Sequence, residues 1–414
     1  MAKLQSIRGT RDLLPDDARR HRMVVDTARA TAERYGYSEV ATPIFEFTEV
    51  FARTLGDTSD IVTKEMYTFT DKGGDSLTLR PEGTAGIARA YMAGELRQIN
   101  PQKFFYSGPM FRHERPQKGR LRQFHQIGVE ILTVASPMAD IEVISMGAHI
   151  LEALGLEGRV ALEINTLGDT ESRQRYREVL VDYLKGHEAR LSEDSRQRLT
   201  RNPLRVLDSK DEGDRAVIAD APVFADYLNE DSRAFFDRVL AGLDTLGIGY
   251  RLSPHLVRGL DYYCHTAFEF TTTELGAQSA VLAGGRYDGL VETMGGPPTP
   301  GVGWAAGIER LVMLAKDPPP PPRPVAVIPV GDDMVDHALR LADTLRRAGQ
   351  AVDMAPTGNF SRRLKRANAL SARAAVLVGG DEWARGEVGL RDLDSGEQTG
   401  VPVAELAQRL GAAL

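Results

Sequence analysis

Two apolar stretches joined by a charged loop stand out in the first third of the chain. Residues 105–132 read FYSGPMFRHERPQKGRLRQFHQIGVEIL, with apolar residues at both ends and charged residues between them. Pro116 and Gly119 mark the tip of the charged part, as expected for a loop. The pattern predicts a strand, a long loop and a second strand.

A further strand is predicted from Tyr262 to Phe270, where aromatic and β-branched residues predominate. The alternation puts Phe268 on one face and Glu269 on the other. Arg258 stands just before this strand. An arginine at the end of a strand is usually solvated and idle. A functional role for it requires support from other parts of the chain.

Glycine-rich segments predict further strand ends and turns. Residues 299–314, TPGVGWAAGIERLVML, predict a strand that runs into a helix near Ala306. The segment LAGGRYDGLV predicts a turn that holds residues 284–288, and TLRPEGTAGIARAY predicts a strand-to-helix junction after Pro81. Neither the dinucleotide-binding pattern GxGxxG nor a P-loop is present.

The clearest domain boundary is KDPPPPPRP at residues 316–324, since consecutive prolines favour a stiff, extended spacer. Strand and helix patterns alternate after it, which predicts a small α/β domain with a mainly parallel sheet. Residues 169–243 are highly charged with helical spacing, and they predict an insertion between two sheet-rich halves. The expected domains are a catalytic domain of residues 1–168 and 244–316, a helical insertion of 169–243, a linker of 317–323 and a C-terminal domain of 324–414.

Composition narrows the possible classes of protein. A chain of 414 residues predicts two or three domains, and a net charge of −7 argues against a protein that coats DNA. The single cysteine, Cys264, excludes a disulfide framework and a cysteine-rich zinc site, and we expect no dedicated protein metal site. No apolar run reaches the length of a membrane span, and the N-terminus lacks an apolar signal core, so we expect a cytoplasmic protein without a membrane partner.

The charged loop is the first candidate for chemistry. Within eleven residues it has a single acid, Glu114, and five cations: Arg112, Arg115, Lys118, Arg120 and Arg122. Such a cluster on an acidic protein fits a polyanion, which is the phosphates of a nucleotide, a nucleic-acid end, or both. A solvated hairpin is the alternative.

Two further charged groups leave alternatives open. Glu130 lies in the apolar stretch GVEIL, where a buried carboxylate needs a partner, either an internal salt bridge or a cationic ligand. In the C-terminal domain a predicted helix has four cations at residues 362–366, which indicates either a solvated face or phosphate contact.

Together these segments resemble a known family. FRHE with RQFHQ resembles motif 2 of class II aminoacyl-tRNA synthetases, GVGWAAGIERL resembles motif 3, and RYGYSEVATPIFE resembles motif 1. RGLDYY and AGGRYDGL look like the signature peptides of histidyl-tRNA synthetases of the bacterial type, and RGTRDLLP and TLRPEGT also fit. The resemblance runs from about Ile7 to the C-terminus.

The resemblance implies an α+β catalytic domain with an antiparallel sheet flanked by helices, a helical insertion and a C-terminal α/β anticodon-binding domain. It implies activation of L-histidine with ATP, release of pyrophosphate and transfer to the 3′ end of tRNA(His). Mg²⁺ is expected to bridge the β- and γ-phosphates of ATP. Motif 1 implies a homodimer.

The same resemblance assigns roles to residues. The expected catalytic residues are Arg258 and Arg112. ATP is expected to contact Arg112, Glu114, Arg120, Phe124 and Arg310. Histidine is expected to contact Glu82, Gly83, Thr84, Gln126, Glu130, Tyr262, Tyr263 and Tyr287. tRNA is expected to contact Arg115 and Lys118.

Two other classes of protein share parts of this sequence pattern. Regulatory subunits of ATP phosphoribosyltransferase resemble the synthetase body but generally lack the C-terminal domain and have degraded signature peptides. Other class II synthetases, such as those for threonine, proline or glycine, share the three motifs but not RGLDYY with AGGRYDGL. Arg258, Tyr262, Tyr263 and the C-terminal domain are all present here, which favours the histidine enzyme. Cys264 and His265 receive no role.

Overall fold

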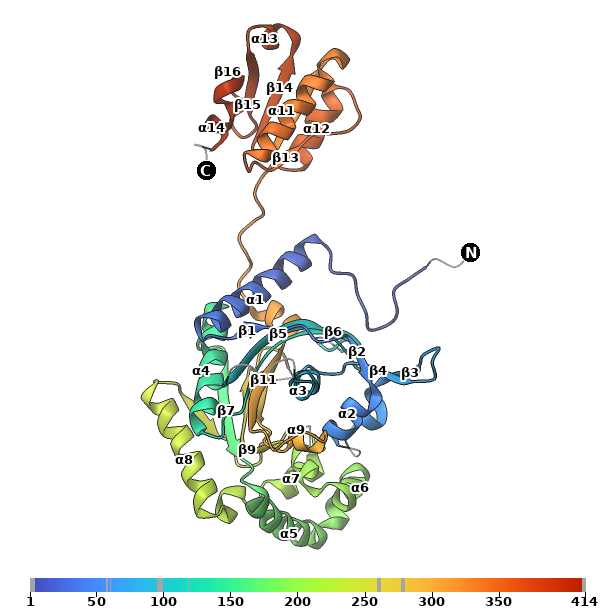
Figure 1. The fold of residues 1–414 in the computed structure, drawn as a ribbon, viewed down its shortest axis with the longest axis vertical. Coiled ribbons are helices and arrows are strands. Elements are labelled where there is room, and N and C mark those ends of the chain that lie inside the picture. The colour runs from blue at the N-terminus through green and yellow to red at the C-terminus, as the bar shows by residue number, and fades with distance from the viewer. Residues whose placement is uncertain are drawn as a thin grey trace. The chain divides into compact units, whose positions relative to one another are not determined.

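The computed structural model describes residues 4–56, 59, 61–94, 100–117, 119–258, 262–276 and 280–411. The chain forms two compact units, Met1–Pro318 and Pro319–Leu414. Each is described by itself (Figure 1). Within these ranges, no helix combines the length and the apolar character that crossing a membrane requires.

A mixed sheet forms the centre of the first unit, with eight strands in the described part of the chain. Its order is β1 (Ser38–Glu39), β5 (Gln102–Phe111), β6 (Gln123–Leu132), β11 (Gly301–Gly307), β10 (Ala280–Arg286), β9 (Cys264–Thr271), β7 (Ala161–Thr166) and β8 (Tyr250–Leu252). The two outermost pairs, β1–β5 and β7–β8, are parallel and the others are antiparallel. The predicted strand, loop and strand of residues 105–132 are confirmed as β5 and β6.

Helices cover both faces of this sheet (Figure 1). One face packs on α1 (Pro15–Arg34), α4 (Pro137–Ala153), α8 (Glu230–Thr245) and α10 (Ile308–Leu314). The other face packs on α3 (Thr84–Met92) and α5 (Thr170–Gly186). Side chains alternate between the two cores along each strand: Phe105 lies in the first, and its neighbours Phe104 and Tyr106 lie in the second.

The charged region of residues 169–243 is helical, as its spacing predicts. It contains α5, α6 (Glu193–Arg201), α7 (Glu212–Ile218) and most of α8. Asp169 begins α5 by accepting a hydrogen bond from the Ser172 backbone N–H at 2.8 Å. Phe236, Val239 and Leu243 of α8 are buried in the same core as α4. The expected boundary at residue 243 therefore falls inside a helix that packs on the catalytic body.

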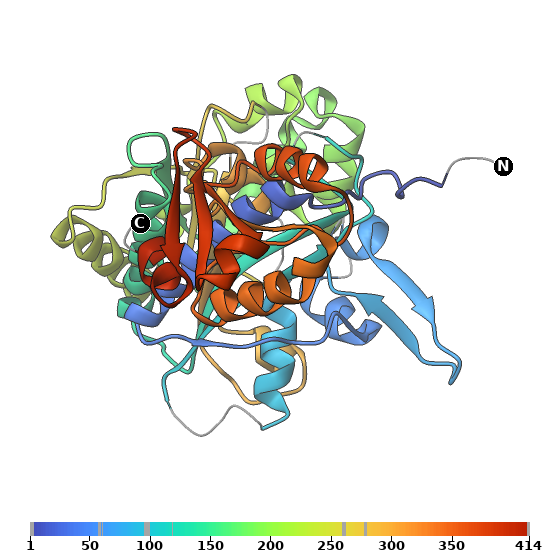
Figure 2. The same cartoon turned by 90° about the horizontal axis from the view of Figure 1, so that it is seen from above.

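A small second sheet of the first unit has the order β2 (Phe45–Phe47), β4 (Ser76–Leu79) and β3 (Tyr67–Thr70). The helix α2 (Thr48–Leu55) follows β2 and packs on this sheet, and α9 (Leu290–Thr293) packs on α2 and α3. The β3–β4 hairpin reaches away from the body in both views (Figures 1 and 2). Phe45, Phe47 and Phe69 are 53%, 57% and 45% exposed, so this sheet leaves apolar surface uncovered in the single chain.

The second unit has a five-stranded sheet over its described residues, in the order β13 (Val352–Asp353), β12 (Val325–Val330), β14 (Ala374–Gly379), β15 (Glu387–Asp392) and β16 (Gln398–Pro402). Its helices are α11 (Val335–Arg347), α12 (Phe360–Ala369), α13 (Gly380–Ala384) and α14 (Leu406–Gly411). The first three strands are parallel, as predicted, and β15 and β16 add an antiparallel edge. Apolar clusters lie on both faces of the sheet.

Two local predictions were wrong. Residues 284–286 lie in β10 rather than in a turn, and the helix after β11 begins at Ile308 rather than near Ala306. The glycines of β10 serve close packing between strands. A Cβ added at Gly284 would lie 2.1 Å from the carbonyl oxygen of Gly303 on β11, and a side chain there would separate the two strands.

Candidate active site

A cavity of about 410 Å³ opens where four neighbouring strands of the sheet, β6, β11, β10 and β9, meet the loop after β5 and the start of α3. Most residues that the sequence assigns to ATP and histidine line it. These are Glu82, Thr84, Arg112, Glu114, Arg120, Phe124, Gln126, Arg258, Tyr262, Tyr263, Tyr287 and Arg310. Segments as distant as residues 82 and 310 therefore meet around one volume, whose size suits a small-molecule ligand.

Arg258 is not a solvated residue at a strand end. Its side chain is 16% exposed and forms a close ion pair with Glu269 of β9. Its guanidinium carbon lies 5.5 Å from the ring centre of Tyr263, and its Nε is buried without a hydrogen-bond partner among the described residues. These contacts fix the position of the Arg258 guanidinium at the cavity, where Glu269 also lies.

Two further arginines border the same cavity. Arg112 donates from Nε to the carbonyl of Pro81 at 2.9 Å, and its guanidinium lies 5.3 Å from the ring centre of Phe124. Arg310 donates from Nη1 to the carbonyl of Ala280 at 2.6 Å. Both are held by backbone acceptors, and Arg310 also donates from Nε to the carbonyl of Gly119 at 3.3 Å, at the tip of the charged loop.

Glu114 orders the base of the charged loop. It is buried, and its carboxylate lies 2.6 Å from Nε of Arg120. Arg115 is exposed and does not line the cavity. Lys118 and residues 259–261 of the RGLDYY peptide lie outside the described residues. The loop thus separates into a base that faces the cavity and an outer cation that faces solvent.

Glu130 is buried and is not among the residues that line the cavity. It accepts hydrogen bonds from Tyr287 Oη at 2.5 Å, Thr84 Oγ1 at 2.7 Å and Tyr106 Oη at 3.4 Å. The sequence left open a salt bridge or a cationic ligand, and the partners in the structure are hydroxyl groups. Burial raises the pKa of Glu130 to about 8, although the hydroxyl donors oppose this shift.

Glycine makes room for this carboxylate. A Cβ at Gly303 of β11 would lie 1.8 Å from Oε2 of Glu130, so any side chain at that position would displace the acid. Gly83, which the sequence assigned to histidine binding, has a similar local role and does not line the cavity. A Cβ there would lie 2.3 Å from the ring of Tyr106.

Glu82 and Gln126 also line the cavity. The Glu82 carboxylate accepts hydrogen bonds from the backbone N–H groups of Thr84 at 2.6 Å and Ala85 at 2.8 Å, which fixes it at the start of α3. Burial raises the pKa of Glu82, and these two backbone donors work against the shift. Oε1 of Gln126 is buried and has no hydrogen-bond partner within the described ranges, so it is an acceptor available to a ligand.

Sequence reasoning missed several residues of the site. Tyr106 was not singled out, although it bonds Glu130, and Glu269 was seen only as one face of a strand. Asp208, Lys210 and Arg215 reach the cavity from the helical region of 169–243. Strand alternation could have indicated Tyr106, because Tyr106 lies opposite Gly128 on β6, two residues from Glu130. The three helical-region residues carry no local signal.

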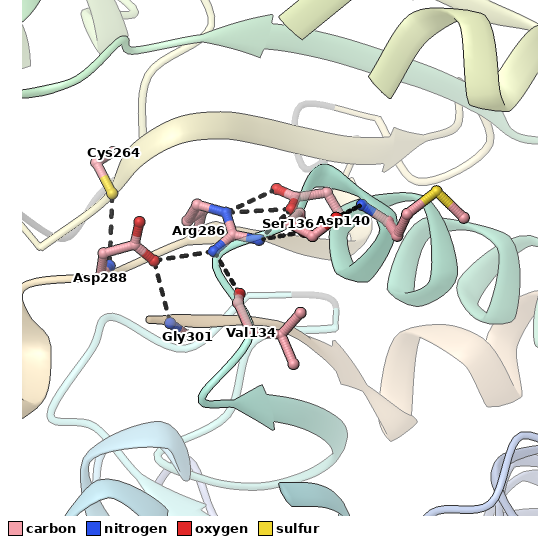
Figure 3. A network of polar contacts seen from close by, with 8 residues as sticks. Val134, Ser136, Asp140, Cys264, Arg286, Asp288 and Gly301 are labelled. Carbon is pink, nitrogen blue, oxygen red and sulfur yellow. Dashed lines mark hydrogen bonds and ion pairs between the residues drawn. The ribbon is translucent and has the colours of Figure 1, made fainter. Parts of the chain in front are cut away.

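Arg286 of the AGGRYDGL peptide is the last residue of β10, directly before Tyr287, and Figure 3 shows its polar contacts. It is fully buried and forms an ion pair with Asp140 of α4, which is also fully buried. It also donates to the carbonyl of Val134 at 2.9 Å and to Asp288 at 3.0 Å. Asp288 in turn accepts from the Gly301 backbone N–H at 3.1 Å. Arg286 therefore joins β10, α4 and the start of β11 beside the cavity.

Comparisons with known proteins agree with this geometry. A family model for histidyl-tRNA synthetase matches residues 9–311, and one for an anticodon-binding domain matches residues 324–412. A histidine--tRNA ligase of Rhodospirillum rubrum is 63% identical over 411 residues, which cover 99% of each chain.

Solved structures show the same fold. The apo histidyl-tRNA synthetase of S. aureus has a TM-score of 0.82 at 34% identity and covers 98% of this chain and 99% of its own. A Bacillus halodurans structure described as an ATP phosphoribosyltransferase regulatory subunit/histidyl-tRNA synthetase has a TM-score of 0.67 at 22% identity, covering 92% of this chain and 99% of its own, which shows a shared fold alone. From the matched family models and the full-length relative, the chain belongs to the histidyl-tRNA synthetase family.

Proposed function

We propose how the residues of this cavity carry out the chain's reaction, the ATP-dependent activation of L-histidine to histidyl-adenylate and its transfer to the 3′ end of tRNA(His). One observation carries the assignment: Arg112, Arg258 and Arg310 come from separate segments and line one cavity with Gln126 and the Tyr262–Tyr263 pair. Fixed guanidinium groups suit phosphate, and the polar and aromatic groups suit an amino acid with an imidazole ring.

In the first step, a carboxylate oxygen of histidine attacks the α-phosphorus of ATP, and the bond to pyrophosphate breaks. The carboxylate is already ionised, so the step needs no protein base. Catalysis is then positioning and neutralisation of charge. Arg112 and Arg258 stabilise the α-phosphoryl group, while Arg310 contacts the γ-phosphate side. Phe124 stacks on the adenine.

Mg²⁺ enters this scheme with ATP, as the counter-ion of the β- and γ-phosphates. Most of the carboxylates that line the cavity already accept hydrogen bonds or ion pairs, namely Glu82, Glu114, Glu269 and Glu309, which favours a metal held mainly by phosphate oxygens.

Selection of the amino acid rests on two groups of polar contacts, one to its α-amino group and one to its imidazole ring. Glu82, Thr84 and Gln126 hold the α-amino group, and the free Oε1 of Gln126 supports this assignment. Glu130 and Tyr263 pair with the imidazole ring, with Tyr262 and Tyr287 beside them. Ligand entry must then replace part of the hydroxyl network around Glu130. An analogue that lacks ring nitrogens would leave these groups unpaired, which penalises its binding.

The second step takes place at the outer side of the cavity. A ribose hydroxyl of the tRNA 3′ end attacks the histidyl carbonyl carbon, and AMP leaves. Arg115 and Lys118 contact the acceptor end, while residues 324–414 bind the anticodon region. We also propose a homodimer formed through the segment around β2, with residues 169–243 as the inserted domain and 317–323 as the linker. Because charging occurs where tRNA is used, we expect a cytoplasmic location.

The test is amino-acid-dependent exchange of labelled pyrophosphate into ATP, with a panel of amino acids and full-length protein. Exchange with histidine alone supports the assignment. A non-catalytic regulatory subunit would show no exchange with any amino acid, and another class II synthetase would require a different one. Either result would refute the proposed residue roles.

A further inference from the structure

Three side chains with metal-binding atoms meet at the cavity wall, and one of them, Glu309, lines the cavity itself. His21 comes from α1, His125 from β6 and Glu309 from α10. One ring nitrogen of each histidine and one carboxylate oxygen of Glu309 all lie within 4.8 Å of one another. His21 and Glu309 are each only 6% exposed. A buried group of this composition is distinct from a scatter of surface acids.

The contacts inside this group leave one atom unsatisfied. The Glu309 carboxylate accepts from His125 Nδ1 at 2.9 Å and from the His125 backbone N–H at 3.0 Å. The ring of His21 meets the ring of His125 edge-on, with centroids 5.4 Å apart. Nε2 of His21 is buried and has no hydrogen-bond partner in the part of the chain that is described. A buried polar atom without a partner requires a physical explanation, such as a bound ion.

We propose that His21, His125 and Glu309 bind one Zn²⁺ ion, with water in the fourth position. Two imidazoles and a carboxylate are a donor set that zinc takes in proteins, whereas Mg²⁺ prefers oxygen ligands. This differs from the sequence-based expectation of no dedicated metal site. His125 and Glu309 are 184 residues apart, so no local spacing could indicate the group.

The geometry requires only a small adjustment. With zinc–ligand bonds of about 2.1 Å, tetrahedral ligand atoms lie about 3.4 Å apart, so the most distant atom moves inward by at most about 1.4 Å. Zinc takes the place of the proton between His125 Nδ1 and Glu309, and the neutral ring then carries its one proton on Nε2. The second carboxylate oxygen can keep its bond to the His125 backbone.

The site would connect α1 to the cavity wall. Phe124 and Gln126 lie on either side of His125 in β6, and Arg310 follows Glu309 in α10. All three of these neighbours line the cavity. A bound ion would therefore fix the positions of α1, β6 and α10 relative to one another. The proposal concerns binding and stability and does not depend on the roles assigned to the cavity residues.

The test uses full-length protein from which metal has been removed with a chelator. Co²⁺ serves as a visible-absorbing probe, and Zn²⁺ competes for the same site. We expect one ion per chain, the visible absorption of a cobalt site with nitrogen and oxygen ligands, and a rise in melting temperature with Zn²⁺. His21→Phe keeps a buried ring but removes a metal ligand. It should weaken metal binding at least tenfold, because loss of even a partner of a ligand typically costs about 10- to 100-fold in affinity. His337→Phe, which changes a histidine of the second unit beside Trp383, is the matched control and should bind normally.

Equal affinity and stoichiometry for wild type and His21→Phe would overturn the proposal, since the ions would then be held adventitiously by other histidines. If His21→Phe does not fold, Glu309→Gln decides the question. Its amide still accepts from the His125 backbone but is a much poorer zinc ligand. Unchanged Co²⁺ absorption in that variant would also refute the site.

Discussion

At the scale of single residues, Arg258 differs from most charged side chains of this protein because both its charge and its partner are largely buried. Changing Arg258 to His should lower histidine-dependent pyrophosphate exchange by at least about a hundredfold, or about 3 kcal/mol, because the charge is needed most in the transition state. ATP binding, measured separately, should be largely retained. Glu269→Gln keeps the guanidinium and should lose less. If Arg258→His exchanged pyrophosphate at the wild-type rate, Arg258 would have no role in the activation step.

Glu130 gives the ligand-free protein a specific pH dependence. Its pKa is raised by burial to about 8 in the folded state, so its proton stabilises the fold at low pH and this contribution is lost as the pH rises to about 8. Glu130→Gln has no such proton. The stability of wild type relative to Glu130→Gln should therefore fall by roughly 3 kcal/mol between pH 5.5 and pH 8. Denaturant unfolding of both proteins at the two pH values measures this, and a constant difference would contradict the buried acid.

The sequence identified most cavity residues because their segments resemble known motifs, but it could not supply their partners. Tyr106 acquires its role from strand pairing, which places it near Glu130, and Glu269 acquires its role from Arg258, which lies outside the strands and contacts it. The glycines of β10 illustrate the reverse error. Glycine is common in turns and also where two backbones approach closely, and only the neighbouring strand distinguishes the two cases.

At the scale of elements, Arg286 joins β10 to α4 through a fully buried ion pair. Arg286→Lys keeps the charge but cannot reach Asp140, Asp288 and the Val134 carbonyl together. Because Tyr287 follows it directly, the KM for histidine should rise several-fold while the KM for ATP stays within about twofold. The melting temperature should also fall. Arg323→Lys, which changes an exposed pair with Asp394, is the control. Equal changes in both KM values would indicate general destabilisation instead of a positioning role.

The loop between β5 and β6 should affect the two half-reactions unequally. Arg115 is exposed and outside the cavity, whereas Arg112 and Arg120 line it. Arg115→Ala with Lys118→Ala should leave pyrophosphate exchange within a few-fold, because exposed charges far from the reacting atoms contribute little. tRNA charging should fall more and become less sensitive to salt, since lost phosphate contacts reduce counterion release. Both assays at two salt concentrations measure this, and an equal loss would mean that the loop tip serves the ATP site alone.

At the scale of the whole molecule, the uncovered apolar surface of β2 and β3 supports an association between copies of the chain. Phe45, Phe47 and Phe69 are each close to half exposed, and Ile44 is 43% exposed. Sedimentation at micromolar concentration should give about twice 45.4 kDa. Phe47→Asp should shift the equilibrium toward the monomer, because a carboxylate buried at the contact would be unpaired. A wild-type monomer under these conditions would contradict both the dimer and the role of this sheet.

The order of the central sheet has a consequence for how the protein is made. β11 lies between β6 and β10, yet it is the last of these strands in the sequence and ends at Gly307. While the ribosome is still producing the preceding residues, β6 and β10 have an open edge each and no neighbour to close it. A ribosome adding about 5 to 20 residues per second needs roughly 9 to 35 seconds to pass from the end of β6 to the end of β11, and the β6 edge stays exposed for that time. Nascent chains are therefore most vulnerable to aggregation in this interval, which makes the speed of translation between β6 and β11 a determinant of yield.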